Sequence, residues 1–436
     1  MAQQSKITSR PLTKALGTAS ILGMAIAGAN FANAIQTDFG VDYRAQAFVV
    51  DSEAFGGSSD TDTGLANLLR LKANFKHEDS GVSLHTSIEL AGDRWSGDTR
   101  TYTTASDDAY NASNRGDNVR LDTAFVRIPY GNGAVVNVGR QATSWNNCFL
   151  VCDDRRDRIN TVIPTSLGVV VLGYDRRQDT ASFYNPDNGD MVNAGLITKI
   201  GGFTTGLLYV HWLENTDDLT APGAYAIPGM HLFSPYISGN LTDTVSLDVG
   251  MNWQGSAARD AGNGTIYSDS STAEYLRLGF DLDMVDLGFQ VIGAQDGGLI
   301  SGGFDTFSSV INNNPESTAN PTSLYQMGGV KAGLEDFDEY IVAARAGFDV
   351  SPRLTLTGAV GMLNVDDGTD DDSSMFYDLQ ASYMVNEAVT TSATWGMLTK
   401  NDVGTTRGNT LVPGSGGASF EDDDLMAASL NVNVKF

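Results

Sequence analysis

Regular alternation of apolar and polar residues is the feature that most constrains the fold of this chain. Nearly every second side chain is apolar in the segments 82–90, 245–254, 275–282, 375–385, 389–397 and 426–436. Side chains on a β-strand point alternately to opposite faces, so each segment is expected to form a strand with one apolar and one polar face. Short turn signals alternate with longer polar stretches between these segments. The pattern predicts an all-β chain whose consecutive strands form antiparallel hairpins.

The N-terminus has the features of an export signal. Lys6, Arg10 and Lys14 precede an apolar run of small residues, and Ala32-Asn33-Ala34 matches the A-x-A cleavage pattern. The run is interrupted by polar residues and is shorter than the roughly 20 apolar residues that a membrane-spanning helix needs. We therefore predict a bacterial signal peptide over residues 1–34 and one mature domain over residues 35–436.

A closed transmembrane barrel explains the remaining pattern better than a secreted sandwich or propeller. No later segment is apolar for long enough to cross a membrane as a helix, and a sheet can satisfy its backbone in lipid only when it is closed. Strands of roughly ten residues, in even number and with aromatic residues near their ends, are typical of such barrels. The aromatic residues in girdle positions are Trp212, Trp253, Tyr383, Trp395 and Phe436.

Counting the strands gives 18, and the two weakest flank a short break at residues 185–190. Without those two the count is 16, which is also even. The longest loops are expected to lie at one end of the barrel and the shortest turns at the other. Residues 142–166, which are rich in charge, and residues 297–337 are both predicted to be long loops.

Two motifs resemble those of a known family. Ala124-Phe125-Val126, followed by Gly133 to Gln141 (GAVVNVGRQ), resembles the segment before the third loop of neisserial and β-proteobacterial porins. The C-terminal LNVNVKF resembles the terminal strand of the same family. The resemblance implies a homotrimeric, 16-stranded diffusion channel of the outer membrane, with its third extracellular loop folded into the lumen. The chain departs from this family in its greater length, in Arg127 where the family has glycine, and in its two cysteines.

The residues expected to act in such a channel are those lining its narrowest point. Alternation places four cations toward the lumen on neighbouring strands, namely Arg44, Arg70, Lys72 and Arg120. The third loop carries a run of six charged residues, Asp153, Asp154, Arg155, Arg156, Asp157 and Arg158. If that loop folds inward, its acids face the basic wall and create a transverse field that favours hydrated, dipolar solutes. In the alternative interpretation the loop arginines pair with neighbouring acids and only fix the shape of the loop.

The sequence offers little support for other chemistry. Cys148 and Cys152 are the only cysteines, and in an exported protein we expect them to form a disulfide rather than a metal pair. There is no G-x-S-x-G motif, Gly-rich phosphate loop or metal-spaced cluster, so neither enzymatic activity nor a cofactor is predicted. His85 alternates with Ser83 and Ser87 and is expected to line the lumen.

The formal charge of −26 becomes −29 when the three cations of the signal peptide are removed. Such a surface repels nucleic acid. The acids gather in loops, chiefly at residues 335–339, 366–372 and 421–424, which are either solvated or bridged by divalent cations to lipopolysaccharide. The sequence thus predicts an outer-membrane porin for passive diffusion of ions and small hydrophilic solutes, weakly selective for cations. A substrate-specific channel and an adhesin or receptor barrel are the alternatives.

Overall fold

The computed structural model describes residues 35–51, 61–94, 120–176, 190–213, 230–255, 270–301, 303–311, 338–366, 371–399 and 424–436. Within these residues the regular structure is entirely β. The strands are β1 Ile35–Asp51, β2 Thr61–His77, β3 Ser83–Arg94, β4 Arg120–Pro129, β5 Val135–Trp145, β6 Val151–Thr165, β7 Gly168–Arg176, β8 Asp190–Ile200, β9 Phe203–Trp212, β10 His231–Asn240, β11 Val245–Gln254, β12 Ser271–Asp281, β13 Val285–Gln295, β14 Asp338–Ser351, β15 Leu354–Asp366, β16 Asp371–Asn386, β17 Val389–Leu398 and β18 Leu425–Lys435.

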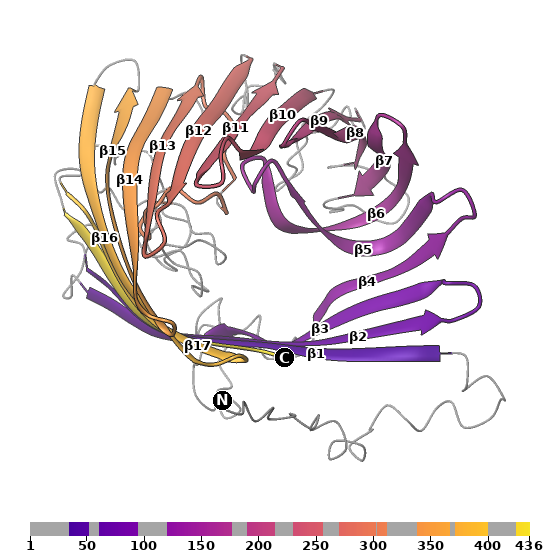
Figure 1. Cartoon of the computed structure of the whole chain (residues 1–436), viewed down its shortest axis with the longest axis horizontal. Coiled ribbons are helices and arrows are strands. Elements are labelled where there is room, and N and C mark those ends of the chain that lie inside the picture. Colours follow the sequence, from indigo (N-terminus) through magenta and orange to yellow (C-terminus); the bar gives the residue numbers. More distant parts are fainter. Residues whose placement is uncertain are drawn as a thin grey trace, which may run out of the picture.

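These strands form one closed antiparallel barrel. Each strand pairs with its neighbours in sequence, and β1 pairs with β18 from Asp42↔Lys435 to Asp51↔Met426 (Figure 1). The closure continues to the end of the chain, where the Val41 amide donates to the Phe436 carbonyl at 2.7 Å. The barrel has 18 strands, so the higher of the two predicted counts is confirmed.

The predicted alternation is visible as an apolar exterior and a polar interior. On β1, Asp42, Arg44 and Gln46 are almost fully buried inside the barrel, whereas the side chains between them are more accessible. The exposed large apolar side chains lie on the outer face of nearly every strand, for example Leu84, Val138, Leu207, Leu276, Val342, Leu379 and Leu430. The outer wall therefore presents a continuous apolar surface.

The segment predicted as the third long loop has a different structure. Residues 142–145 continue β5, a turn occupies residues 146–150, and residues 151–165 form β6. A short turn at Ser166 and Leu167 then leads into β7, which ends at Arg176. The predicted short turn at residues 176–179 therefore begins a longer connection at the opposite end of the barrel.

The main cluster of buried apolar residues lies inside the barrel. It joins the inner faces of β12 to β18 to residues that follow β13, including Phe304, Phe307, Val310 and Ile311. The predicted signal peptide and most of the acidic loop residues lie outside the described part of the chain. No helix among the described residues is long and apolar enough to cross a membrane.

Candidate functional site

The outer half of the β5–β6 hairpin leaves the barrel wall. Pairing of β5 with β4 ends at Ala124↔Arg140, and pairing of β6 with β7 ends at Asp157↔Arg176. Beyond these points residues 141–156 pair only with each other in the described structure, and we call this hairpin the arm. Figure 1 shows β5 and β6 curving away from β4 toward β10 and β11.

Gly139 lies where the arm separates from β4. Its φ of +127° is rarely adopted by residues with a side chain, and a Cβ there would lie 2.3 Å from the Ala124 carbonyl oxygen. A glycine at this position therefore lets β5 approach β4 closely and then bend inward. The GRQ of the porin-like motif thus contains the bend of the arm.

The tip of the arm is bound to the inner faces of β10, β11 and β12. The Trp145 indole donates to the Ser234 carbonyl at 3.0 Å, and the Asn146 amide donates to the Ser234 hydroxyl at 3.2 Å. Tyr275 donates its hydroxyl to Asn146 Oδ1 at 3.1 Å and accepts from Asn147 at 2.9 Å. The arm therefore spans the lumen from the β4–β7 side to the β10–β12 side.

The backbone of the tip has a left-handed conformation that is rare outside glycine. The disulfide and the space left by Gly250 accommodate this conformation. Asn146, Asn147 and Cys148 all have positive φ values, of 57°, 52° and 68°. A disulfide joins Cys148 to Cys152 across the turn. Gly250 on β11 leaves space for the tip, because a Cβ there would lie 2.1 Å from Asn146 Oδ1.

A second segment narrows the lumen from the β12–β18 side. Residues 299–301 and 303–311, which follow β13, pack against the inner wall, and we call them the inner segment. Phe307 lies beneath the guanidinium groups of Arg277 and Arg345, at 5.0 and 4.4 Å from the ring centroid. The Ser309 amide donates to Asp378 on β16 at 2.7 Å. Sequence reasoning placed these residues in a long loop without assigning them a position.

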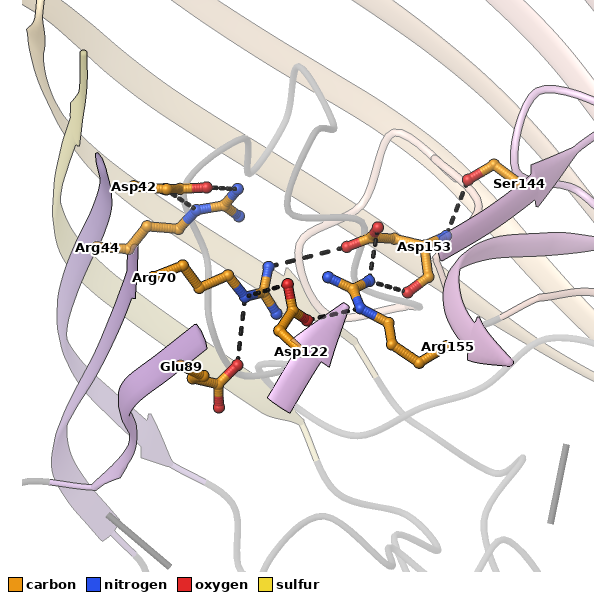
Figure 2. A network of polar contacts seen from close by, with 8 residues as sticks. All are labelled: Asp42, Arg44, Arg70, Glu89, Asp122, Ser144, Asp153 and Arg155. Carbon is orange, nitrogen blue, oxygen red and sulfur yellow. Dashed lines mark hydrogen bonds and ion pairs between the residues drawn. The ribbon is translucent and has the colours of Figure 1, made fainter. Parts of the chain in front are cut away.

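Charged side chains meet where the arm faces β2, β3 and β4 (Figure 2). The Arg155 guanidinium donates to Asp122 at 2.7 Å and contacts the Asp153 carboxylate at 2.6 Å. Arg70 lies 3.2 Å from Glu89, 3.6 Å from Asp122 and 4.0 Å from Asp153. We call these five residues the eyelet. They join the arm to the wall through alternating charges.

The predicted basic wall is a mixed wall. Arg44 pairs with Asp42 at 3.2 Å, and Arg70 pairs with three acids, two of them on the wall itself. Lys72 is exposed. The backbone of Arg120 pairs with Glu89, and its side chain lies outside the described part of the structure. The register shift between Ser87 and Ile88 brings Asp122 to the inner side, where it is only 8% exposed.

The six charged residues predicted as a constriction loop lie on strand β6 and divide between its two faces. Asp153, Arg155 and Asp157 lie on one face, where Asp157 contacts Arg140 at 3.7 Å. Asp154, Arg156 and Arg158 lie on the other face. The sequence could not reveal this division, because a strand with charge on both faces has the composition of a loop.

The second face of the arm closes a side cavity of about 700 Å³, which we call the chamber. Its other walls are the inner faces of β7, β8 and β9 and the start of the inner segment. Arg158 contacts Asp175 at 2.5 Å, and Arg156 contacts the same carboxylate at 3.4 Å. Trp212, predicted to lie in an outer girdle, lines this chamber instead. The lining of the chamber includes Trp145, Arg156, Arg158, Asp175, Asn193 and Trp212.

His85 lies on the inner wall in a hydrogen-bonded chain. It contacts Ser83 Oγ through Nε2 at 2.8 Å and Asn74 Oδ1 through Nδ1 at 2.9 Å, and it stacks on Phe125. Arg127 lies directly opposite Ser83, so its charge opposes the imidazolium that a general base would have to form. Among the described residues, no group of three or more His, Cys, Asp or Glu could hold a metal ion.

Comparison with known proteins identifies the fold. No family model matches the sequence, and no curated protein is similar to it. Similar solved structures include Pseudomonas aeruginosa OpdO, with 12% identity and a TM-score of 0.57 over 92% of this chain and 97% of that one. Pseudomonas aeruginosa OpdK, solved with vanillate, has 11% identity and a TM-score of 0.56 over 92% and 99%. Pseudomonas aeruginosa OccK11 (OpdR) has 10% identity and a TM-score of 0.56 over 92% and 96%.

Identities this low demonstrate a shared fold alone. The resemblance to neisserial and β-proteobacterial porins rests only on the two short motifs described above. The barrel fold of this chain, in contrast, is shared with these structures over 92% of its length. The chain therefore has the fold of the outer-membrane porin barrels.

Proposed function

We propose that this chain forms a water-filled channel in the bacterial outer membrane, through which ions and small hydrophilic solutes diffuse passively. The observation that carries the proposal is the eyelet, in which opposite charges from the wall and the arm meet inside a closed barrel. Fixed, paired charges lining a narrow passage interact with hydrated solutes and disfavour apolar ones. The apolar outer surface fits an acyl-chain environment.

Weak cation selectivity is part of the proposal. The eyelet contains two arginines and three acids, so it adds little bias of its own. The whole chain carries a formal charge of −26, with much of the acid in loops. Such loops concentrate counter-cations at the mouth of a channel. We therefore attribute the selectivity to the mouth rather than to the narrowest point.

The proposed partners follow from this location. The outer wall would contact outer-membrane lipid and lipopolysaccharide, and the acidic loops are candidates for divalent cations that bridge to lipopolysaccharide phosphates. A homotrimer is proposed from the porin resemblance. We propose no catalytic role, because none of the four histidines lies in a recognisable nucleophile motif and the sequence has no G-x-S-x-G.

A substrate-specific channel is the second candidate function. The chamber supports it, because a concave site with apolar walls and a few convergent polar groups is typical of small-molecule binding. OpdK, which shares the fold, was solved with vanillate. An adhesin or receptor role for the long loops would be compatible with either channel.

Planar-bilayer recording of the purified protein tests the main proposal. We expect stepwise current increases whose size rises nearly linearly with salt concentration. Under a salt gradient the reversal potential should have the sign of a weakly cation-selective pore. Protein that is folded, as judged by heat-modifiable mobility on a gel, but passes no current would contradict the proposal.

A further inference from the structure

The chamber lies on the opposite face of the arm from most of the eyelet, and Asp153 at the edge of the arm lines both. Asp153 and Arg155 face the wall of β2 to β4, where they form the eyelet. Arg156 and Arg158 face the opposite way, toward Asp175 on β7. A solute in the chamber would therefore lie beside the narrow passage. Its volume of about 700 Å³ is within the range of small-ligand sites.

The polar wall of the chamber is internally neutralised. Arg158 donates to both oxygens of Asp175, at 2.6 and 2.5 Å, and to the Thr143 hydroxyl at 3.0 Å. Arg156 contacts Asp154 at 3.1 Å and shares Asp175. Because the Asp175 side chain is 0% exposed, an incoming anion would have to compete with a buried carboxylate for both guanidinium groups. The third acid of the lining, Asp153, pairs with Arg155, so each charged group of the wall has an oppositely charged partner in a fixed position.

The remaining lining is apolar and aromatic. Trp145 and Trp212 both line the chamber, together with aliphatic side chains of β9 and of the inner segment. Trp145 is held in place by its hydrogen bond to Ser234 and by an edge-to-face contact with Tyr236, 5.3 Å between centroids. Rigid aromatic rings bind ligands with little loss of conformational entropy. Asn193 adds an amide on the β8 side, above Gly173.

We propose that the chamber binds a neutral sugar of one or two rings. This inference rests on the proposed channel function and names a solute class for it. A pyranose has apolar C–H faces that pack against indole rings, and hydroxyls at its edge that hydrogen-bond to arginine, carboxylate and amide groups. The paired charges of the chamber favour such a solute over a free carboxylate. The chamber therefore differs in preference from a site for an aromatic anion such as vanillate.

Equilibrium dialysis of the folded full-length protein with labelled glucose or maltose tests the inference. We expect saturable binding at millimolar concentration, weakened about tenfold or more by Trp212→Leu, which is a loss of about 1.4 kcal/mol or more. Trp253→Leu is the matched control, because Trp253 is not among the chamber residues and lies on the outer-facing register of β11. Its binding curve should coincide with that of the wild type.

Two results would overturn the inference. One is the absence of saturable sugar binding by wild-type protein with normal heat-modifiable mobility. The other is saturable binding of vanillate without sugar binding, lost in Trp212→Leu, which would assign the chamber to aromatic anions. Bilayer recordings distinguish an error in the chamber assignment from an error in the channel proposal. A conducting protein that binds no sugar retains the channel function and loses only the chamber assignment.

Discussion

At the scale of single residues, Arg155 connects the two sides of the eyelet. It contacts Asp122 on the wall and Asp153 on the arm, and its side chain is 16% exposed. Arg70 contacts the same two acids from the wall side. Arg155 and Arg70 together explain why a segment rich in charge can lie inside the barrel, because each charged group there has a neighbour of opposite charge.

Replacing Arg155 should change selectivity more than stability. Arg155→Gln leaves Arg70 as the only cation of the eyelet, against three acids. We expect the reversal potential in a salt gradient to shift toward stronger cation selectivity, because the eyelet then repels anions. Arg127→Gln also removes one positive charge, but at the far end of β4, and should shift the reversal potential less than Arg155→Gln does. Equal shifts in the two variants would contradict the role given to the eyelet.

Gly250 tests the docking of the arm tip. In Gly250→Ala the new Cβ would overlap Asn146 Oδ1 and Tyr275, and overpacking of this kind costs about 1–3 kcal/mol. We expect the tip to detach from β11 while the barrel remains closed, giving a larger and noisier single-channel current. Gly347→Ala is the control, because its Cβ would meet only ordinary contacts at 3.7 Å or more. A quiet, unchanged current in Gly250→Ala would contradict the docked tip.

At the scale of elements, the disulfide determines how rigid the arm is. It closes a very short loop, for which the chain-entropy relation gives a contribution of about 2 kcal/mol. Reduction, or the change of both cysteines to serine, should therefore loosen the tip without unfolding the barrel. We expect more current fluctuation with unchanged heat-modifiable mobility. Loss of the folded form on reduction would mean that the disulfide supports the barrel itself.

The strands with one apolar face are the elements that the sequence predicts correctly. Strands with one apolar face, such as β11 and β17, are predictable because lipid and water lie on their opposite sides. The inward position of the arm was predicted, but its strand structure was missed because both of its faces look into the lumen and β6 carries charge on both. The strand β6 lies within the segment predicted as a loop, and residues 177–189, which include part of the predicted break, lie outside the described residues.

The inner segment was missed for a related reason. Its apolar residues Phe304, Phe307 and Ile311 have the i, i+3, i+7 spacing of a helix, yet residues 303–311 form no helix. They are buried by packing against the inner faces of strands distant in sequence, which a periodicity cannot show. Likewise, alternation places Glu89 and Asp122 on polar faces, but only the register of β2, β3 and β4 shows that both pair with Arg70.

At the scale of the whole molecule, the closed sheet and the lumen have separate roles. Closure of β1 on β18 leaves no open edge and provides the stable wall. The arm and the inner segment occupy the lumen without completing the sheet. Changes to either should therefore alter permeation while the barrel remains intact.

The most direct test of this division is the single-channel conductance of a protein without its arm. Gln141 and Arg156 are paired opposite each other, so residues 142–155 can be replaced by Asn-Gly, which suits a two-residue hairpin turn. We expect a folded, heat-modifiable barrel whose conductance is several-fold larger and whose selectivity no longer depends on Arg70. Conductance equal to that of the wild type would contradict the claim that the arm defines the narrow passage.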